Sequence, residues 1–205
     1  IDAKFRNAGQ TCVCANRIFV HKTIHDTFVE RLAERTARLR VGDGCAPDTE
    51  IGPLIDEAAV KKLDALLSDA VAKGGTIAVG GSRHKLGGTY FEPTLLTGMT
   101  AEMEIFSEEI FGPVSTIIAF ENIEEMVCQA NATPFGLAAY LFGRDLSRVW
   151  RTVEALDFGI VGVNTGLIST ELAPFGGVKE SGHGREGARY GIDDYIDTKY
   201  VCLSL

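Results

Sequence analysis

The chain has 205 residues and a formal net charge of −8, from 28 acidic and 20 basic residues. This surplus of negative charge disfavours non-specific binding to nucleic acid or to anionic membranes. Hydrophobic residues make up 45% and charged residues 23%, the composition of an ordinary globular chain, with no apolar stretch long enough to span a bilayer. We therefore expect neither a nucleic-acid partner nor a membrane partner.

Apolar residues recur along the chain with periods that switch between those of strands and those of helices. Asp56 is a plausible N-cap for the second helix, and Pro93 predicts that its strand is an edge strand or carries a bulge. The alternation favours an α/β fold with a mostly parallel sheet. The predicted strands span residues 17–21, 76–79, 90–97, 115–120, 138–142 and 159–163, and the predicted helices 24–39, 57–73, 123–130 and 146–156.

The five cysteines and four histidines show no zinc-ribbon or other metal-binding spacing. His21 and His25 are four residues apart, but His21 ends a strand pattern, so the pair does not predict a site on one helix face. An odd number of cysteines without a framework is typical of free thiols in a reducing compartment. We expect no metal, and a cytoplasmic location, or the mitochondrial matrix in a eukaryote.

The run FRNAGQTCVC over residues 5–14 is the most chemically suggestive part of the chain. Small and polar residues lead into Cys12, and a buried strand pattern follows at Ile18. A loop of this kind can hold a thiol at the mouth of a pocket and aim backbone N–H groups at the atom that the sulfur attacks. The alternative is a buried structural cysteine, which is the commoner fate of a free thiol.

Two further motifs follow, SEEIFGP at residues 107–113 and APFGGVKESGHGRE at residues 173–186. With the GQTC run, they resemble the aldehyde dehydrogenase superfamily, whose members carry these three motifs in this order. The resemblance covers essentially the whole chain but only the C-terminal portion of a family member. It implies a three-layer α/β catalytic domain over residues 1–182 and a tail with an oligomerisation strand over 183–205. The N-terminal cofactor-binding domain would lie outside this chain, which we read as a segment of a longer one.

The resemblance also assigns roles to three side chains. Cys12 would add to an aldehyde carbonyl as a thiolate, with its own backbone N–H as an oxyanion donor. Glu109 would bind the ribose hydroxyls of NAD or NADP, and the ring of Phe111 would fix the nicotinamide. The alternative for these two is a surface carboxylate beside a core phenylalanine. The general base, the second oxyanion donor and the residues that distinguish NAD from NADP are expected upstream.

Arg6 and Ser169 are candidates for holding the substrate. A guanidinium six residues before Cys12 could pair with a carboxylate at the far end of an aldehyde, and the Ser169 hydroxyl could donate to the same group. Here the chain is especially similar to succinate-semialdehyde dehydrogenases, which implies oxidation of succinate semialdehyde to succinate in 4-aminobutyrate breakdown. Glutarate semialdehyde would be held by the same groups. The alternatives are a solvated loop charge and a turn hydroxyl.

Two further expectations concern regulation and assembly. The resemblance implies that Cys14 forms a disulfide with Cys12 that switches activity off, although thiols two residues apart need a bent loop to pair. The alternative is a second thiol pointing into the core. The weakly charged segment 196–205 would be an aggregation-prone edge by itself, so we expect it to pair with something. The resemblance implies that this pairing takes place in a homodimer or homotetramer. A non-catalytic protein with this fold is the rival from another class, and the isolated segment is expected to be inactive.

Overall fold

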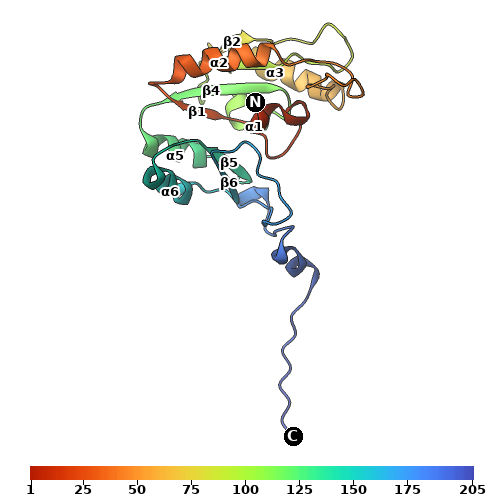
Figure 1. Ribbon diagram of the computed structural model, residues 1–205, viewed down its shortest axis with the longest axis vertical. Helices are drawn as coiled ribbons and strands as arrows, with labels where there is room; N and C mark the ends of the chain where they lie inside the picture. The colour runs from red at the N-terminus through yellow and green to blue at the C-terminus, as the bar shows by residue number, and fades with distance from the viewer. The chain divides into compact units, whose positions relative to one another are not determined.

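A computed structural model describes all of residues 1–205 (Figure 1). The chain divides into two compact units, unit 1 over Ile1–Thr133 and unit 2 over Pro134–Leu205. Unit 1 contains α1 (Asp2–Phe5), η1 (Arg6–Gly9), β1 (Ile18–His21), α2 (His25–Ala37), α3 (Glu57–Ala72), β2 (Thr76–Val79), β3 (Thr94–Thr97), α4 (Glu104–Ser107), β4 (Val114–Phe120) and α5 (Ile123–Asn131). Unit 2 contains β5 (Ala138–Leu141), α6 (Leu146–Ala155), β6 (Ile160–Val163), η2 (Lys179–Ser181) and η3 (Arg189–Tyr195).

Unit 1 is built on a four-stranded sheet with the strand order β1-β4-β3-β2. The pairs β1–β4 and β4–β3 are parallel, and β2–β3 is antiparallel. Strand β4 lies in the middle, and its residues from Val114 to Ile118 are all buried. A continuous buried run of this kind marks a strand that is covered on both faces. The predicted mostly parallel sheet is confirmed.

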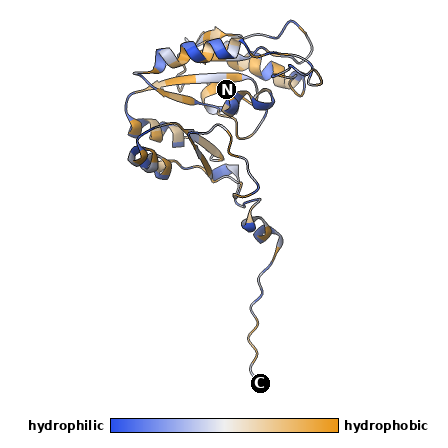
Figure 2. Cartoon of the chain, viewed as in Figure 1, coloured by the Kyte–Doolittle hydropathy of each residue, from blue (hydrophilic) through white to orange (hydrophobic).

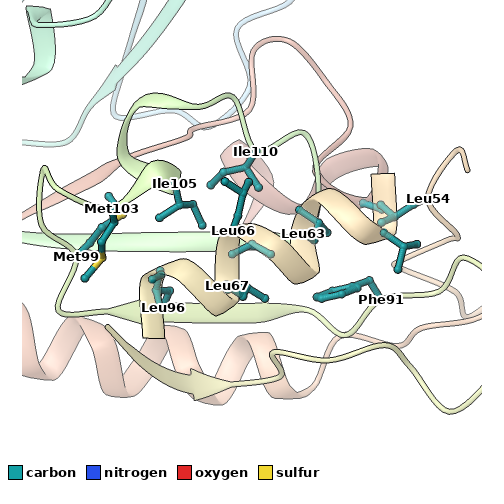
Figure 3. Packing of buried hydrophobic residues seen from close by; sticks show 14 of the residues in the cluster. Leu54, Leu63, Leu66, Leu67, Phe91, Leu96, Met99, Met103, Ile105 and Ile110 are labelled. Carbon is teal, nitrogen blue, oxygen red and sulfur yellow. The ribbon is translucent and has the colours of Figure 1, made fainter. Parts of the chain in front are cut away.

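Helices cover both faces of this sheet. Successive residues of a strand point to opposite faces, and the neighbours Leu95 and Leu96 belong to different buried clusters. Leu95 packs with Val29 and Leu32 of α2. Leu96 belongs to the larger cluster with α3, part of which Figure 3 shows: Leu63, Leu66, Leu67, Met103, Ile105 and Ile110. Unit 1 therefore has a helix–sheet–helix arrangement. In Figure 2 its strands are largely hydrophobic, whereas α2 has long hydrophilic stretches.

The predicted elements agree with the observed ones except around Pro93. The predicted N-cap of α3 is confirmed, because the Asp56 side chain accepts a hydrogen bond from the Ala59 N–H at 2.8 Å. The strand predicted over 90–97 is shorter and begins at Thr94. It is also an interior strand, so the prediction of an edge is wrong. Pro93 lies just before the strand and needs no partner for the N–H that it lacks, and the irregularity of register falls between Ile77 and Val79 of β2.

Unit 2 begins with a compact strand–helix–strand unit. Strands β5 and β6 pair in parallel, and α6 connects them with an Asp145 side chain that caps its first turn. A parallel pair needs a long connection of this type. The last residues, 196–205, are exposed and belong to no strand of this chain. Their pairing with another chain stays a prediction.

No helix in the structure combines the length and the apolar character needed to cross a lipid bilayer.

Candidate functional site

The loop that carries Cys12 starts with a strained backbone turn. Asn7, Ala8 and Gly9 have φ angles of 52°, 55° and 74°, all in the left-handed region. The N–H of Gln10 donates to the Asn7 carbonyl at 3.0 Å and closes this turn. Residues other than glycine enter this region at a cost and persist there only when their surroundings hold them. Ala8 and Gly9 are buried and hold the strained turn against the core, whereas Asn7 is exposed.

Cys12 itself is exposed at the end of this turn. Its backbone N–H donates to no acceptor within the chain, whereas the neighbouring Cys14 N–H is bonded to the Thr11 carbonyl at 2.9 Å. An accessible thiol beside an unengaged N–H is the arrangement that a nucleophile with an oxyanion donor requires. The alternative of a buried structural cysteine does not fit this exposure.

The side chain of Gln10 ties the loop to a distant part of unit 1. Its amide nitrogen donates to the Pro53 carbonyl at 3.3 Å, and its amide oxygen accepts from the Ile55 N–H at 2.8 Å. The sequence places Gln10 in the motif but gives no indication of this anchoring role. The two bonds fix the position of the loop two residues before the thiol.

The GQTC run and the Glu-x-Phe-Gly-Pro motif meet through two glycines. A Cβ atom added to Gly9 would lie 2.0 Å from the carbonyl oxygen of Gly112, which is not possible without moving one backbone. Only glycine permits this approach, and the φ of Gly9 favours glycine as well. The structure thus brings together, in unit 1, the Cys12 loop and the predicted cofactor motif, which are about a hundred residues apart in the sequence.

Asn16 makes a second link between these two segments. Its Nδ2 donates to the Glu108 carbonyl at 2.8 Å, and its Oδ1 accepts from the Ile110 N–H at 2.8 Å. Its own carbonyl accepts from the Thr116 hydroxyl on β4 at 2.6 Å. Sequence analysis missed this residue. The available signal was a polar side chain just before a buried strand, which is weak evidence by itself.

Glu109 and Phe111 both reach the surface of unit 1. Glu109 is exposed, and its carbonyl accepts a hydrogen bond from the Lys62 ammonium at 2.5 Å. Phe111 is 40% exposed and has a φ of 50°. The alternative of a core phenylalanine is therefore wrong, and a strained backbone that presents an apolar ring to solvent is typical of a binding site. The carboxylate and the ring are both available to a cofactor.

A buried lysine lies next to both segments and was not anticipated. Lys4 is only 3% exposed, and burial lowers the pKa of its ammonium to about 8, an effect that Cys14 and Glu109 partly oppose. Desolvation disfavours the charged form, and nearby negative charge favours it. Nothing in the sequence distinguishes Lys4 from a surface lysine, because its burial depends on how α1 packs.

The remaining predicted side chains occupy different parts of the chain. Arg6 is half-buried at the start of η1, and its carbonyl lies 3.8 Å from the thiol sulfur of Cys14, which is half-buried. All five cysteines are free. Ser169 is exposed in unit 2, where it lines a shallow hollow of about 500 Å³ with Thr170, Glu171, Phe175, Glu186 and Gly187. No group of three or more histidine, cysteine or acidic side chains is placed to hold a metal ion.

The Pro-Phe-Gly-Gly motif packs within unit 2. The Val178 N–H donates to the Gly136 carbonyl, and the Ser181 hydroxyl accepts from the Gly136 N–H, both at 2.9 Å. A Cβ atom added to Gly159 would lie 2.0 Å from the Gly176 carbonyl oxygen. Gly136 and Gly159 precede β5 and β6, so the motif closes over the amino ends of this strand pair.

Comparison with known proteins agrees with the motifs. The sequence profile of the aldehyde dehydrogenase family matches residues 1–201. The chain belongs to the aldehyde dehydrogenase family. Among its relatives in this family is a 3-sulfolactaldehyde dehydrogenase of Pseudomonas putida, 55% identical over 98% of this chain and 41% of the relative. Another is the NADP⁺ succinate-semialdehyde dehydrogenase GabD of Escherichia coli, 51% identical over 99% of this chain and 42% of the relative.

The fold of the aldehyde dehydrogenase family is confirmed as well. A crystal structure of succinate-semialdehyde dehydrogenase from Burkholderia pseudomallei superposes with a TM-score of 0.97 at 55% identity, covering 99% of this chain and 42% of that one. The predicted α/β fold and the predicted family are therefore correct. The chain spans about two fifths of the length of the curated relatives that it matches.

Proposed function

We propose that the complete protein is an NAD- or NADP-dependent aldehyde dehydrogenase and that its substrate is succinate semialdehyde. The observation that carries this proposal is the meeting of Gly9 with Gly112, which sets an exposed thiol loop beside an exposed carboxylate and ring. This is the pairing of nucleophile and cofactor contact that thiol-dependent aldehyde oxidation needs.

Cys12 would start the reaction. Its thiolate adds to the aldehyde carbon, and its backbone N–H donates to the oxygen that becomes negatively charged. Bound NAD or NADP supplies the acceptor for the hydride that leaves this carbon, so that a thioester remains on Cys12. Water then cleaves the thioester, which releases the carboxylic acid and returns the thiol. Glu109 would orient the cofactor by accepting hydrogen bonds from ribose hydroxyls, and Phe111 would bound the nicotinamide.

The substrate assignment rests on Arg6 and Ser169. Both relatives named above carry the names of aldehydes with an anionic group, a carboxylate in one case and a sulfonate in the other. A guanidinium and a hydroxyl suit either anion. Succinate semialdehyde is the first candidate and sulfolactaldehyde the second. Glutarate semialdehyde is one methylene longer, and a pocket discriminates a methylene only modestly.

The test of the activity is steady-state oxidation of succinate semialdehyde by the complete native protein. Cys12→Ala should reduce the rate by at least about 10⁴-fold, the usual effect of removing a covalent nucleophile. Cys14→Ala is the matched control and should retain activity. A similar loss in both variants would contradict the assignment of Cys12.

The substrate test compares charged and neutral aldehydes. Arg6→Ala and Ser169→Ala should raise KM for succinate semialdehyde by about 10- to 100-fold, because a carboxylate loses a charged partner or a hydroxyl partner. Butanal, which has no carboxylate, should be affected less than about threefold. Equal effects on both aldehydes would be compatible with aldehyde dehydrogenase activity but would contradict the assignment of succinate semialdehyde as the substrate.

We also propose the predicted redox switch, the assembly and the domain limits. Cys12 and Cys14 are both free, and the Sγ of Cys14 faces the carbonyl of Arg6 in the same loop. If they form the switch, oxidised protein yields a linked Cys12–Cys14 peptide by mass spectrometry, and absence of that peptide from inactivated protein would refute it.

Residues 1–182 would form the catalytic domain and 183–205 the tail that pairs in a dimer or tetramer. Free thiols suit a reducing compartment, the cytoplasm or the mitochondrial matrix.

A further inference from the structure

We propose that Asn16 is a positioning residue that holds Glu109 in place relative to the Cys12 loop. This inference rests on the proposed function, in which Glu109 contacts the cofactor. The two partners of the Asn16 side chain are the Glu108 carbonyl and the Ile110 N–H, both at 2.8 Å. These groups belong to the residues on either side of Glu109. The Asn16 side-chain amide therefore binds the backbone immediately before and immediately after Glu109.

The segment that contains Glu109 has few other supports. Helix α4 ends at Ser107, and Glu108 continues with an extended backbone. Glu108 and Glu109 are both exposed. Apart from the Asn16 bonds, the Glu108 N–H donates to the Glu104 carbonyl at 3.0 Å, and the Lys62 ammonium donates to the Glu109 carbonyl at 2.5 Å. Ile110, the next residue, is buried in the α3 cluster and fixes one end of the stretch. The exposed Glu108 and Glu109 have no such packing, so hydrogen bonds to their backbone decide where the Glu109 side chain lies.

Asn16 is itself fixed to the sheet. Its carbonyl accepts from the hydroxyl of Thr116, which is completely buried in β4. The next residue, Arg17, donates to the Gln129 and Ala130 carbonyls at 2.9 Å, at the end of α5. Asn16 is thus a rigid point four residues after Cys12. Its side-chain hydrogen bonds thereby fix the backbone at Glu109, which lies more than ninety residues away in the sequence.

An amide is required at this position, because one group must donate and the other must accept. Alanine would lose both bonds, and aspartate would keep the bond to Ile110 while placing a carboxylate against the Glu108 carbonyl. Hydride transfer depends on reacting atoms about 3–3.5 Å apart, so a displaced cofactor contact lowers cofactor affinity and the rate of hydride transfer. Attack by Cys12 on an ester needs no cofactor and is spared.

The experiment uses the complete native protein with Asn16→Ala, and with Asn16→Asp as a near-isosteric second variant. The dissociation constants of NADH and NADPH are measured by fluorescence, and acylation of Cys12 by p-nitrophenyl acetate is followed without cofactor. Both variants should weaken binding of the physiological cofactor by about 5- to 20-fold, the loss of one or two hydrogen bonds. Acylation should stay within about twofold of the wild type.

Asn122→Ala is the matched control, since the Asn122 side chain caps α5 by accepting from the Glu125 N–H at 3.0 Å. It should lower the thermal midpoint slightly, because the helix loses its cap, and leave cofactor binding unchanged. The inference fails if both Asn16 variants bind cofactor like the wild type, or if acylation falls in step with cofactor binding. Glu109→Gln tests the cofactor role of Glu109 separately from the positioning role of Asn16. If it leaves cofactor affinity unchanged, the cofactor role proposed for Glu109 fails. If it weakens binding while the Asn16 variants do not, only the inference fails.

Discussion

The Cys12 loop and the Pro-Phe-Gly-Gly motif are both rich in glycine and small residues, but the structure uses them differently. In unit 1, Gly9 meets Gly112 beside an exposed thiol, the side-chain amide of Gln10 fixes the loop, and that of Asn16 binds the backbone on either side of Glu109. In unit 2, Gly176 meets Gly159 at the ends of β5 and β6, where backbone bonds to Gly136 hold the motif. A close approach of two glycines thus holds the Cys12 loop in one region and packs the motif against two strands in the other.

The largest effect is expected from substituting the two glycines that lie closest to another backbone, Gly9 and Gly159. Gly9→Ala and Gly159→Ala each place a Cβ atom 2.0 Å from a carbonyl oxygen, so both should destabilise their units by about 3 kcal/mol or more. Only Gly9→Ala should also reduce the reactivity of Cys12, by at least about 100-fold, because it displaces the loop. Thermal unfolding and the rate of Cys12 alkylation by iodoacetamide measure the two effects.

Gly44→Ala is the control for the glycine pair, since no atom lies within 4 Å of the added Cβ atom. It should change stability by less than about 0.5 kcal/mol. Loss of Cys12 reactivity in folded Gly159→Ala would show that the motif of unit 2 also positions the thiol, and would contradict the contrast between the two motifs.

A smaller effect is expected from the buried cation of unit 1. The pKa of Lys4 is lowered to about 8 in the folded chain, so between pH 8 and its ordinary value of 10.5 the unfolded chain binds more protons. Stability from this group should therefore rise as the pH rises through that window. Lys4→Met should abolish the rise and increase stability at pH 7 by about 1–3 kcal/mol.

Urea unfolding of wild type and Lys4→Met at several pH values checks this sign. Lys62→Met is the comparison, because the Lys62 side chain is exposed. A stability gain for Lys4→Met that is the same at pH 7 and pH 10 would contradict the titration of a buried ammonium.

The smallest effects should come from the helix caps, and here the two units should behave alike. Asp56 caps α3 in unit 1 by accepting a hydrogen bond from a backbone N–H at 2.8 Å. Asp145 caps α6 in unit 2 in the same way at 3.0 Å. Alanine at either position should cost about 1 kcal/mol. The thermal midpoint is the measurement, with Cys12 alkylation unchanged in both variants. A reactivity change in Asp56→Ala would mean that α3 also controls the loop.

Much of the fold could be predicted because its determinants are local. The apolar periods mark the strands and helices, and the N-cap at Asp56 needs only three following residues to form. Cys12, Glu109 and Phe111 are predicted from short motifs in the same way. For Ser169 and Arg6 the sequence supplies a position and a chemistry but no partner, so their roles stay proposals.

By itself, the sequence determined which segments form strands and helices, the α/β class and the family motifs. Tertiary structure alone decided that β3 is an interior strand, that Gly9 touches Gly112, that Lys4 is buried and that Asn16 grips the backbone around Glu109. The physical reason is range. Propensities and caps act over a few residues, whereas the contacts of Gly9 and Asn16 join segments about ninety to a hundred residues apart. The place of β3 and the burial of Lys4 likewise exist only after the elements have packed together.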